Sequence, residues 1–274
     1  MQVHGSIVAA SLVGAALCVG GCHREATERP DAFSWSEELA PGTTLHLRTT
    51  NGSVTVRGSA EPRAHVQGSK RWRRGRERDV RFVVARDGHD VYVCAIWRRR
   101  GGRCGDERYR PSPPRWVQMF GLLRRRSDMA ASLDVALPAG VRVDASTVNG
   151  QLTITEASGD IRAETINGDI RASTIGGGLQ LKTVNGSIRA RAAALDKDAP
   201  VELESVNGSV VAEVPSPLDA DVSLATVNGH ISTDFPLAVT GSQSKRKLNG
   251  TLGAGGRPVK LTTVNGSVEL KSRS

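Results

Sequence analysis

A short motif centred on Asn-Gly recurs along the chain and constrains its fold more than any other feature. In the second half it occurs six times, each time preceded by Thr or Ser and then Val or Ile. The turn residues of these copies are Asn149, Gly150, Asn167, Gly168, Asn185, Gly186, Asn207, Gly208, Asn228, Gly229, Asn265 and Gly266. A repeat of this kind predicts structural units that stabilise one another by stacking.

The repeat has a strict nine-residue period between residues 148 and 192. The first position is apolar, the third is always glycine, the fifth is a large aliphatic and the seventh is aliphatic or Ala. In a strand these four positions share one face, so we expect all of them to point inward. The first-position residues predicted to be buried are Val148, Ala157, Ile166, Ile175 and Val184.

Asn-Gly is also the strongest short signal for a tight β-hairpin. A two-residue turn would pair Val148 with Gln151 and Ile166 with Asp169 on one face, and this mismatch would recur at every copy. Stacked coils that bend at the glycine keep the large aliphatics buried and are therefore favoured over a hairpin meander. They would also place Asn over Asn in a ladder.

Insertions follow only the units that carry Asn-Gly, which indicates that two nine-residue sides form one coil of about eighteen residues. The longest insertion, 234–247, leads to a further copy at Leu248-Asn249-Gly250. An early copy at Asn51-Gly52 places the start of the architecture near residue 40. The predicted fold class is all-β, a single-chain β-solenoid, helix-like or roll-like, of nine-residue half-coils.

The N-terminus resembles a bacterial lipoprotein leader. An apolar stretch from Ile7 to Leu17 is short for a membrane span, and Val19-Gly20-Gly21-Cys22 resembles a lipobox whose cysteine is acylated. The first residues lack Lys and Arg, so an uncleaved helical anchor or a plain secretory signal stays open. By resemblance, His23 in place of aspartate after the cysteine favours lipid anchoring in the outer membrane of the cell envelope, on its periplasmic or surface face.

Two cysteines remain once Cys18 and Cys22 are assigned to the leader. Cys94 and Cys104 are ten positions apart, and in an exported chain we expect them to form a disulfide. A metal site is not expected, because two thiols with only His89 nearby lack the four ligands that zinc requires. No cofactor is predicted.

Positive charge is concentrated in residues 63–126, which carry 19 Lys or Arg and 6 Asp or Glu, against 18 and 22 in the rest of the chain (37 − 19 and 28 − 6). Arginine interleaved with tryptophan is typical of surfaces that bind polyanions. The candidate residues are Arg71, Trp72, Arg73, Arg74, Arg98, Arg99, Arg100, Arg124, Arg125 and Arg126. Behind a lipoprotein leader, the expected partners are anionic lipid, lipopolysaccharide or envelope glycan rather than nucleic acid. A solvated loop in an arginine-rich chain is the alternative.

The predicted organisation has four parts. Residues 1–21 are a signal peptide and 22–38 a tether to the membrane. Residues 39–143 form an N-terminal β region, with a strand pair across Asp87-Gly88 and an Arg-rich insertion at 98–128. Residues 144–274 form the Asn-Gly repeat.

The segment Leu137-Pro138-Ala139-Gly140-Val141, followed by Thr-Val-Asn-Gly copies, resembles bacterial β-strand-repeat domains of unknown function. Their family name is "putative adhesin". The resemblance covers roughly residues 40–274 and implies an all-β solenoid exposed at the envelope. It supplies no catalytic residue and no established ligand.

Three other interpretations of the sequence have less support. A calcium-binding nonapeptide roll needs an aspartate in every unit, whereas the fourth position is Asp only at Asp160 and Asp169. Asn-Gly-Ser and Asn-Gly-Thr triplets match glycosylation acceptors but are explained by turn chemistry. An enzyme is disfavoured because the histidines are scattered. The sequence favours a lipid-anchored, non-enzymatic binding or structural module, or alternatively an envelope-stress component that senses anionic lipid or glycan through its Arg/Trp-rich segment.

Overall fold

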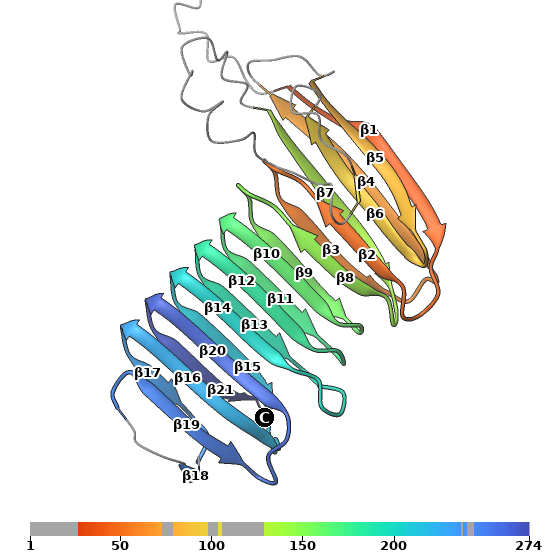
Figure 1. The fold of residues 1–274 in the computed structure, drawn as a ribbon. Helices are drawn as coiled ribbons and strands as arrows, with labels where there is room; N and C mark the ends of the chain where they lie inside the picture. Colours follow the sequence, from red (N-terminus) through yellow and green to blue (C-terminus); the bar gives the residue numbers. More distant parts are fainter. Residues whose placement is uncertain are drawn as a thin grey trace, which may run out of the picture.

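The described part of the chain consists of β-strands joined by turns and loops. The computed structural model describes residues 27–72, 79–97, 104–105, 129–236, 238–239 and 244–273. Within them the strands form one sheet of ten strands, sheet A, and one of eleven, sheet B, which face each other along an elongated stack (Figure 1). None of these residues forms a helix long and apolar enough to cross a membrane. The predicted all-β class is confirmed.

The middle of the molecule is a regular stack in which successive strands alternate between the two sheets. Each strand pairs in parallel with the strand two places along the chain, and Ile161 lies beside Leu179, an offset of eighteen residues. The two-residue hairpin is therefore excluded here. The strands are β8 (Arg142–Ser146), β9 (Leu152–Ala157), β10 (Ile161–Asn167), β11 (Ile170–Thr174), β12 (Leu179–Asn185), β13 (Ile188–Ala192), β14 (Val201–Asn207) and β15 (Val210–Pro215).

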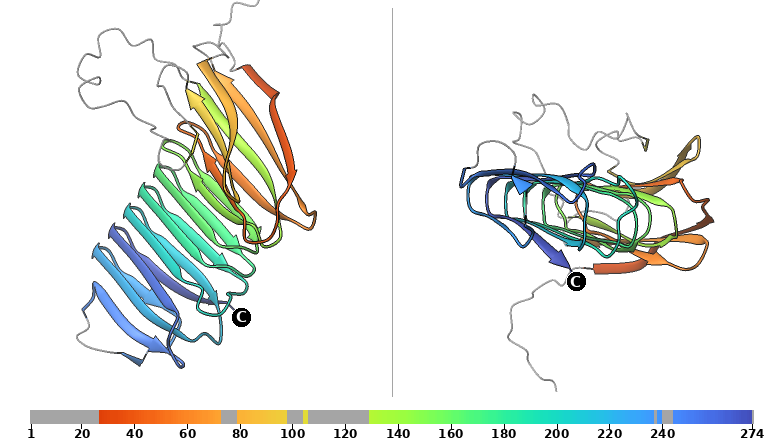
Figure 2. Two further views of the ribbon diagram at one scale, coloured as in Figure 1. Left: turned by 45° about the vertical axis from the view of Figure 1, so that its right-hand side comes forward. Right: turned by 90° about the horizontal axis from the view of Figure 1, so that it is seen from below.

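We use the word rung for a sheet B strand together with the sheet A strand that follows it. Seen along the stack, the rungs superimpose as flattened loops with two layers (Figure 2). The two layers enclose one continuous aliphatic core, in which Leu152, Ile161, Ile170, Leu179 and Ile188 are completely or almost completely buried. These are the fifth-position aliphatics of the repeat, and their predicted burial is confirmed. Removing this apolar area from water is the main stabilising contribution.

The N-terminal end of the stack departs from simple succession. The early copy forms a rung, β2 (Thr44–Arg48) and β3 (Val54–Ser59), which pairs directly with β8 and β9. Between these rungs in sequence come β4 (Arg63–Trp72), β5 (Val80–Asp87), β6 (Asp90–Trp97) and β7 (Ala130–Pro138), which lie on the outer side of β2 and β3. Strands β5 and β6 are antiparallel across Gly88, as predicted.

Two predicted boundaries do not match the strands. Residues 27–38 were expected in the tether but form β1 (Thr27–Glu38), which pairs antiparallel with β4 at the edge of sheet A. The boundary at residue 143 falls inside β8, because the N-terminal strands and the repeat share both sheets. The signal peptide and residues 22–26 lie outside the described residues.

The C-terminal rungs are not stacked in chain order either. Strands β16 (Ala220–Asn228) and β17 (Ile231–Thr233) do not pair with β14 and β15. Instead β20 (Pro258–Asn265) and β21 (Val268–Arg273) lie between the two rungs and pair in parallel with both. The predicted further copy at Leu248-Asn249-Gly250 does not form a rung: Asn249 and Gly250 lie inside β19 (Lys247–Leu252), which pairs antiparallel with β16 and with β18 (Ala238–Val239), an edge strand of sheet B.

The Asn-Gly edge is where the chain passes from sheet B to sheet A, and its packing corrects one prediction. The inward position at the end of each sheet B strand is held by the Thr or Ser before Val or Ile, and the next side chain points outward. Ile166 is 45% exposed, Val184 is 40% exposed and Val148 is partly exposed. Of the five first-position residues predicted to be buried, only Ala157 is buried. Ile175, 52% exposed, lies at the opposite edge.

The physical reason is a hydrogen bond that the hydroxyl makes inside the stack. Thr165 Oγ1 donates to the carbonyl of Gly150 at 3.2 Å and Thr183 Oγ1 to that of Gly168 at 3.0 Å, and the pattern repeats at Thr147, Ser205, Thr226 and Thr263. A buried hydroxyl with such a partner is stable, so Thr takes the inward position. The following aliphatic side chain then points to the outer face.

The glycines are required because neighbouring rungs approach each other closely at this edge. A Cβ on Gly186 would overlap the carbonyl oxygen of Gly168, and a Cβ on Gly168 would overlap that of Gly150. Only glycine leaves room for this contact between backbones. The predicted bend at glycine is therefore correct, and the space that a side chain would need is occupied by a backbone carbonyl of the neighbouring rung.

The predicted asparagine ladder is also present. From Asn149 onward, each side-chain amide donates from Nδ2 to Oδ1 of the preceding asparagine of the ladder at 2.7–2.9 Å. The ladder follows the spatial order of the rungs, Asn51, Asn149, Asn167, Asn185, Asn207, Asn265 and Asn228, so it crosses both breaks in chain order.

Candidate functional site: the outer face of sheet B

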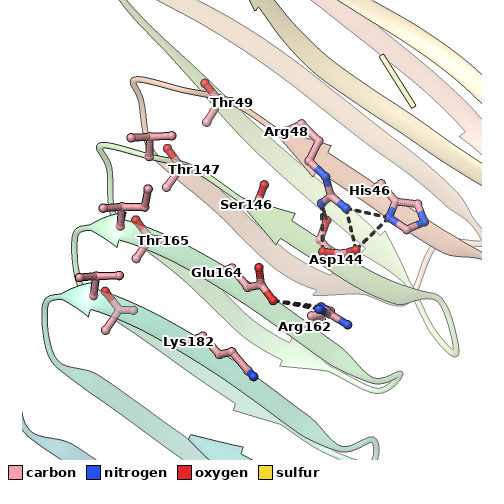
Figure 3. Close-up of a pocket in the computed structure, with 14 residues that line it drawn as sticks. His46, Arg48, Thr49, Asp144, Ser146, Thr147, Arg162, Glu164, Thr165 and Lys182 are labelled. Carbon is pink, nitrogen blue, oxygen red and sulfur yellow. Dashed lines mark hydrogen bonds and ion pairs between the residues drawn. The ribbon is translucent and has the colours of Figure 1, made fainter. Parts of the chain in front are cut away.

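The outer face of sheet B is hollowed along the Asn-Gly edge. A groove of about 750 Å³ runs over β2, β8, β10 and β12, with polar side chains from each strand along its floor (Figure 3). A second hollow of about 410 Å³ continues over β14, β16 and β20. Together they make an open, elongated surface rather than a closed pocket, which suits a long ligand better than a small one.

One side of the groove consists of exposed branched aliphatics, one from each rung except the first, where Thr50 precedes the asparagine. We call them the aliphatic row; its members are Val148, Ile166, Val184, Val206, Val264 and Val227. Five of them are 39–52% exposed, and all stand directly before an asparagine of the ladder. Because the rungs are hydrogen-bonded strands, the members repeat at about 4.8 Å. A continuous exposed apolar row of this kind commonly marks an interaction site.

The other side of the groove carries ion pairs that bridge or line the strands. Arg162 Nη2 lies 3.0 Å from Glu164 Oε1, and Glu204 accepts from both Lys182, at 3.1 Å, and Lys260, at 2.8 Å. The hydrogen bond from Lys260 is the main cause that lowers the pKa of Glu204, and the same contact raises the pKa of Lys260. These groups are half-exposed, so they add polar contacts for a ligand more than stability.

A compact charged cluster closes the N-terminal end of the groove. Arg48 on β2 makes a forked contact with Asp144 on β8: Nη1 donates to Oδ1 at 2.9 Å and Nη2 to Oδ2 at 2.7 Å. Arg48 is only 8% exposed, and Nη1 also donates to the backbone carbonyl of Asp144 at 2.6 Å. Paired, forked geometry of this type makes burial of the guanidinium tolerable.

His46 fills the centre of this cluster (Figure 3). Its Nδ1 lies 3.0 Å from Asp144 Oδ2 and 3.1 Å from Arg48 Nη2, so it either donates to the carboxylate or accepts from the guanidinium. Its Nε2 lies 3.5 Å from Asp90 Oδ2, and its ring stacks on Tyr92 with centroids 4.2 Å apart. Both ring nitrogens therefore face charged groups of the fold, a structural arrangement that joins β2, β6 and β8.

The pKa values of both aspartates reflect these contacts. Burial alone would raise the pKa of Asp144, but hydrogen bonds and charge from His46 and Arg48 outweigh it and lower the pKa to about 2. Burial also acts to raise the pKa of Asp90, and the hydrogen bond from the Thr44 backbone together with His46 outweighs it, so this pKa too is lowered. Both groups stay ionised in the folded protein at neutral pH.

The cluster escaped the sequence prediction, in which the histidines appeared scattered. A signal for it exists nevertheless. His46 and Asp144 each stand five positions before an asparagine of the ladder (51 − 46 and 149 − 144), so aligning the copies on Asn places the two side chains next to each other. The alternation in Leu45-His46-Leu47-Arg48 puts His46 and Arg48 on the same outer face.

Two residues of the predicted polyanion site, Arg71 and Trp72, lie in the described part of the chain. Arg71 is exposed on β4, and the neighbouring Trp72 packs against a small cluster that contains Val80, Ala95 and Met129. Its indole therefore contributes to packing. The other predicted members, Arg73, Arg74, Arg98, Arg99, Arg100, Arg124, Arg125 and Arg126, lie outside the described residues, as does the predicted lipidation site Cys22.

The disulfide between Cys94 and Cys104 is present, with the two Cα atoms 5.7 Å apart. Cys94 lies on the outer face of β6 beside Tyr92 and Ile96, so the bridge holds Cys104 over that strand. Within the described part of the chain, no group of three or more His, Cys, Asp or Glu side chains is arranged to hold a metal ion.

Comparison with known proteins identifies the repeat. Residues 164–271 match the Toastrack family, DUF4097. The Toastrack match includes the last four Asn-Gly copies of the ladder together with Asn167, and it confirms the predicted resemblance to a β-repeat domain of unknown function for this part of the chain. No curated protein matches the chain in sequence.

Two crystal structures align with most of this chain. One, from Clostridium sporogenes, is described as a putative cell adhesion protein; it is 12% identical, covers 89% of this chain and 100% of its own, and has a TM-score of 0.49. The other, from Bacteroides fragilis, is described as a putative adhesin; it is 8% identical, covers 91% and 98%, and has a TM-score of 0.29.

Proposed function

We propose that this protein is a non-enzymatic, adhesin-like binding module of the bacterial envelope, and that it binds an extended glycan along the outer face of sheet B. The observation that carries the proposal is the aliphatic row, which exposes one branched side chain from each of six successive rungs beside a line of ion pairs. The position before the asparagine has no inward role in these six rungs and is nevertheless aliphatic in all of them. Their exposure costs solvation free energy without a ligand.

The ligand class is argued from the periodicity of the surface. A β-solenoid of parallel rungs, which is the architecture we infer for the stack, repeats the same contacts at every step. A polymeric glycan repeats as well, and each sugar presents an apolar CH face together with hydroxyl groups. The CH faces would pack on the aliphatic row, while Glu164, Lys182 and Glu204 would hydrogen-bond the hydroxyls.

The proposed test replaces three members of the aliphatic row together, Ile166→Ser, Val184→Ser and Val206→Ser. Each is at least 40% exposed, so folding should be retained. Binding to purified lipopolysaccharide and to its isolated polysaccharide, measured by calorimetry, should weaken by more than about tenfold, because three apolar contacts are lost. The control is Ile175→Ser, which is 52% exposed but lies at the opposite edge. Unchanged binding by the triple variant would reject the row as the binding site.

We propose further that Cys22 is lipidated and anchors the chain in the outer membrane. The support is the lipobox-like Val19-Gly20-Gly21-Cys22 at the end of an apolar leader. Labelling with a radioactive fatty acid should mark the wild-type protein in membrane fractions, whereas Cys22→Ser should be unlabelled and move to the periplasmic fraction. Labelled Cys22→Ser protein would exclude this site.

A second function is favoured by the charge distribution. Residues 63–126 hold 19 basic and 6 acidic residues, so a sensor that contacts anionic lipid through this segment remains a competing proposal. Binding to anionic vesicles would then fall steeply with salt and disappear when residues 98–126 are deleted. The aliphatic row variants would leave such binding unchanged, which separates the two functions.

A further inference from the structure

The asparagine ladder ends at Asn51 and at Asn228, and the two ends differ in whether the backbone N–H of the following glycine has a hydrogen-bond acceptor. Along the ladder, the backbone N–H of each glycine donates to the carbonyl of the next asparagine. Gly52 donates to Asn149, Gly168 to Asn185 and Gly186 to Asn207, and the series continues to Gly266, which donates to Asn228 at 2.9 Å. Asn228 is the last member, and no residue in the described part of the chain accepts a hydrogen bond from the Gly229 N–H.

The asparagine side chains differ in the same way. Asn185 is held on both sides, because its Nδ2 donates to Asn167 and its Oδ1 accepts from Asn207, both at 2.9 Å. Asn228 donates to Asn265 at 2.8 Å, and its Oδ1 accepts nothing from the residues that the structure describes. Asn228 is also exposed to solvent. Among the described residues, the Gly229 N–H thus has no acceptor and the Asn228 side chain is held on one side only.

We propose that Asn228 is a site of spontaneous deamidation in the folded protein, and that the ladder protects the other Asn-Gly pairs of the stack. In this reaction the Gly229 amide nitrogen loses its proton to water or hydroxide and attacks Cγ of Asn228. The new N–Cγ bond closes a five-membered succinimide, and the side-chain amide leaves as ammonia. Water then opens the ring to aspartate or isoaspartate, so that one water is consumed and one ammonia is released.

The ladder blocks this reaction at two points. The glycine nitrogen cannot lose its proton readily while it donates to a neighbouring carbonyl, and the amide side chain cannot turn toward it while it is hydrogen-bonded on both sides. Two hydrogen bonds worth about 1 kcal/mol each correspond to a protection of roughly tenfold or more. At Asn228 the product removes the donor to Asn265 and places a negative charge at the end of the aliphatic row, next to Val227.

The chain contains its own matched control. Thr183-Val184-Asn185-Gly186 and Thr226-Val227-Asn228-Gly229 have the same sequence, so they differ in their place in the stack and in the next residue, Ser187 or His230. The variant His230→Ser removes that second difference. Both sites should then react at the same rate in guanidinium, where the stack is unfolded.

The experiment incubates the His230→Ser protein at pH 8.5 and follows the mass increase and isoaspartate at each site by fragment-ion mass spectrometry. In the folded protein, Asn228 should react at least about tenfold faster than Asn185. Asn228→Gln should abolish the early product, because a glutamine would have to close a larger ring. Equal rates at the two sites in the folded protein, or a preference for Asn228 that persists in guanidinium, would overturn the proposal.

Discussion

The outer face of sheet B carries ion pairs at both its N-terminal end and its middle, but the pairs at the N-terminal end are buried and those in the middle are exposed to solvent. At the N-terminal end Arg48 and His46 are each 8% exposed and meet Asp144 beneath the stacked ring of Tyr92. In the middle, Lys182 and Lys260 meet Glu204 in the open, with side chains that are 47% and 48% exposed. The same outward positions of one repeat thus support a buried structural clip and a solvated surface. The difference in burial determines what each charge contributes.

The largest effect is expected from Asp144→Asn. The variant leaves Arg48 buried without a counter-charge, and breaking a buried pair in this way costs about 3 kcal/mol. The free energy of unfolding, from urea denaturation, should fall by that amount. Arg48→Met in the same background would remove the stranded charge and should restore part of the loss. An Asp144→Asn protein as stable as the wild type would mean that the two regions do not differ.

The second-largest effect is expected from acid, which should reduce the stabilisation that the buried Asp144 provides at the N-terminal end. The pKa of Asp144 is about 2 in the folded protein and 3.8 ordinarily, so its carboxylate favours the folded state above about pH 4. This contribution, about 2 kcal/mol, is lost as the pH falls through 2. Urea midpoints should therefore drop between pH 4 and pH 2 more steeply in the wild type than in Asp144→Asn. Parallel profiles of the two proteins would show that Asp144 is not the source.

An uncharged buried contact tests whether burial alone is sufficient for an effect. Thr183, 4% exposed, donates to the carbonyl of Gly168, and Thr183→Val keeps its shape but leaves that carbonyl without this donor. The expected cost is about 1 kcal/mol, intermediate between the two classes of ion pair. Thermal unfolding measures it, and Thr153→Val on the partly exposed outer face of sheet A is the control, with little expected change.

The smallest effect is expected at Glu204. Glu204→Gln removes the charge partner of two lysines, yet the pair is solvated and should contribute no more than about 0.5 kcal/mol. Stability measured in low and high salt should be nearly the same for the variant and the wild type. A loss near that of Asp144→Asn would show that position on the sheet, rather than burial, sets the strength.

Much of the fold could be predicted from the period of nine. The glycines and the fifth-position aliphatics specify parallel rungs, so the asparagine ladder, the coil of eighteen and the burial of Leu152 and Ile170 followed from the sequence. The outward orientation of Ile166 and Val184 did not, because hydrophobicity alone assigns an isoleucine or a valine to the core. Hydrophobicity takes no account of the preceding threonine, whose hydroxyl donates a hydrogen bond to a glycine carbonyl of the neighbouring rung and so occupies the inward position.

The order of the rungs could not be predicted for a different reason. In every rung the sheet B strand leads into the same Asn-Gly motif, so β8 can pair with β2 or with any other sheet B strand at nearly equal local cost. The charged cluster depends on that order, since His46 and Asp144 are 98 residues apart in sequence. Its position was visible in the alignment of the copies, but its formation required knowing which copies are neighbours.

The insertion of β20 and β21 between earlier rungs has a consequence for biosynthesis. These strands leave the ribosome after β16 and β17, yet they are a middle layer of the finished stack. The rungs therefore cannot be added to the stack strictly in the order of their synthesis. The rung of β16 and β17 can reach its final position only after β20 and β21 have been translated and have paired with it. Removing residues 258–273 would therefore delete an internal rung of the stack and not its C-terminal end.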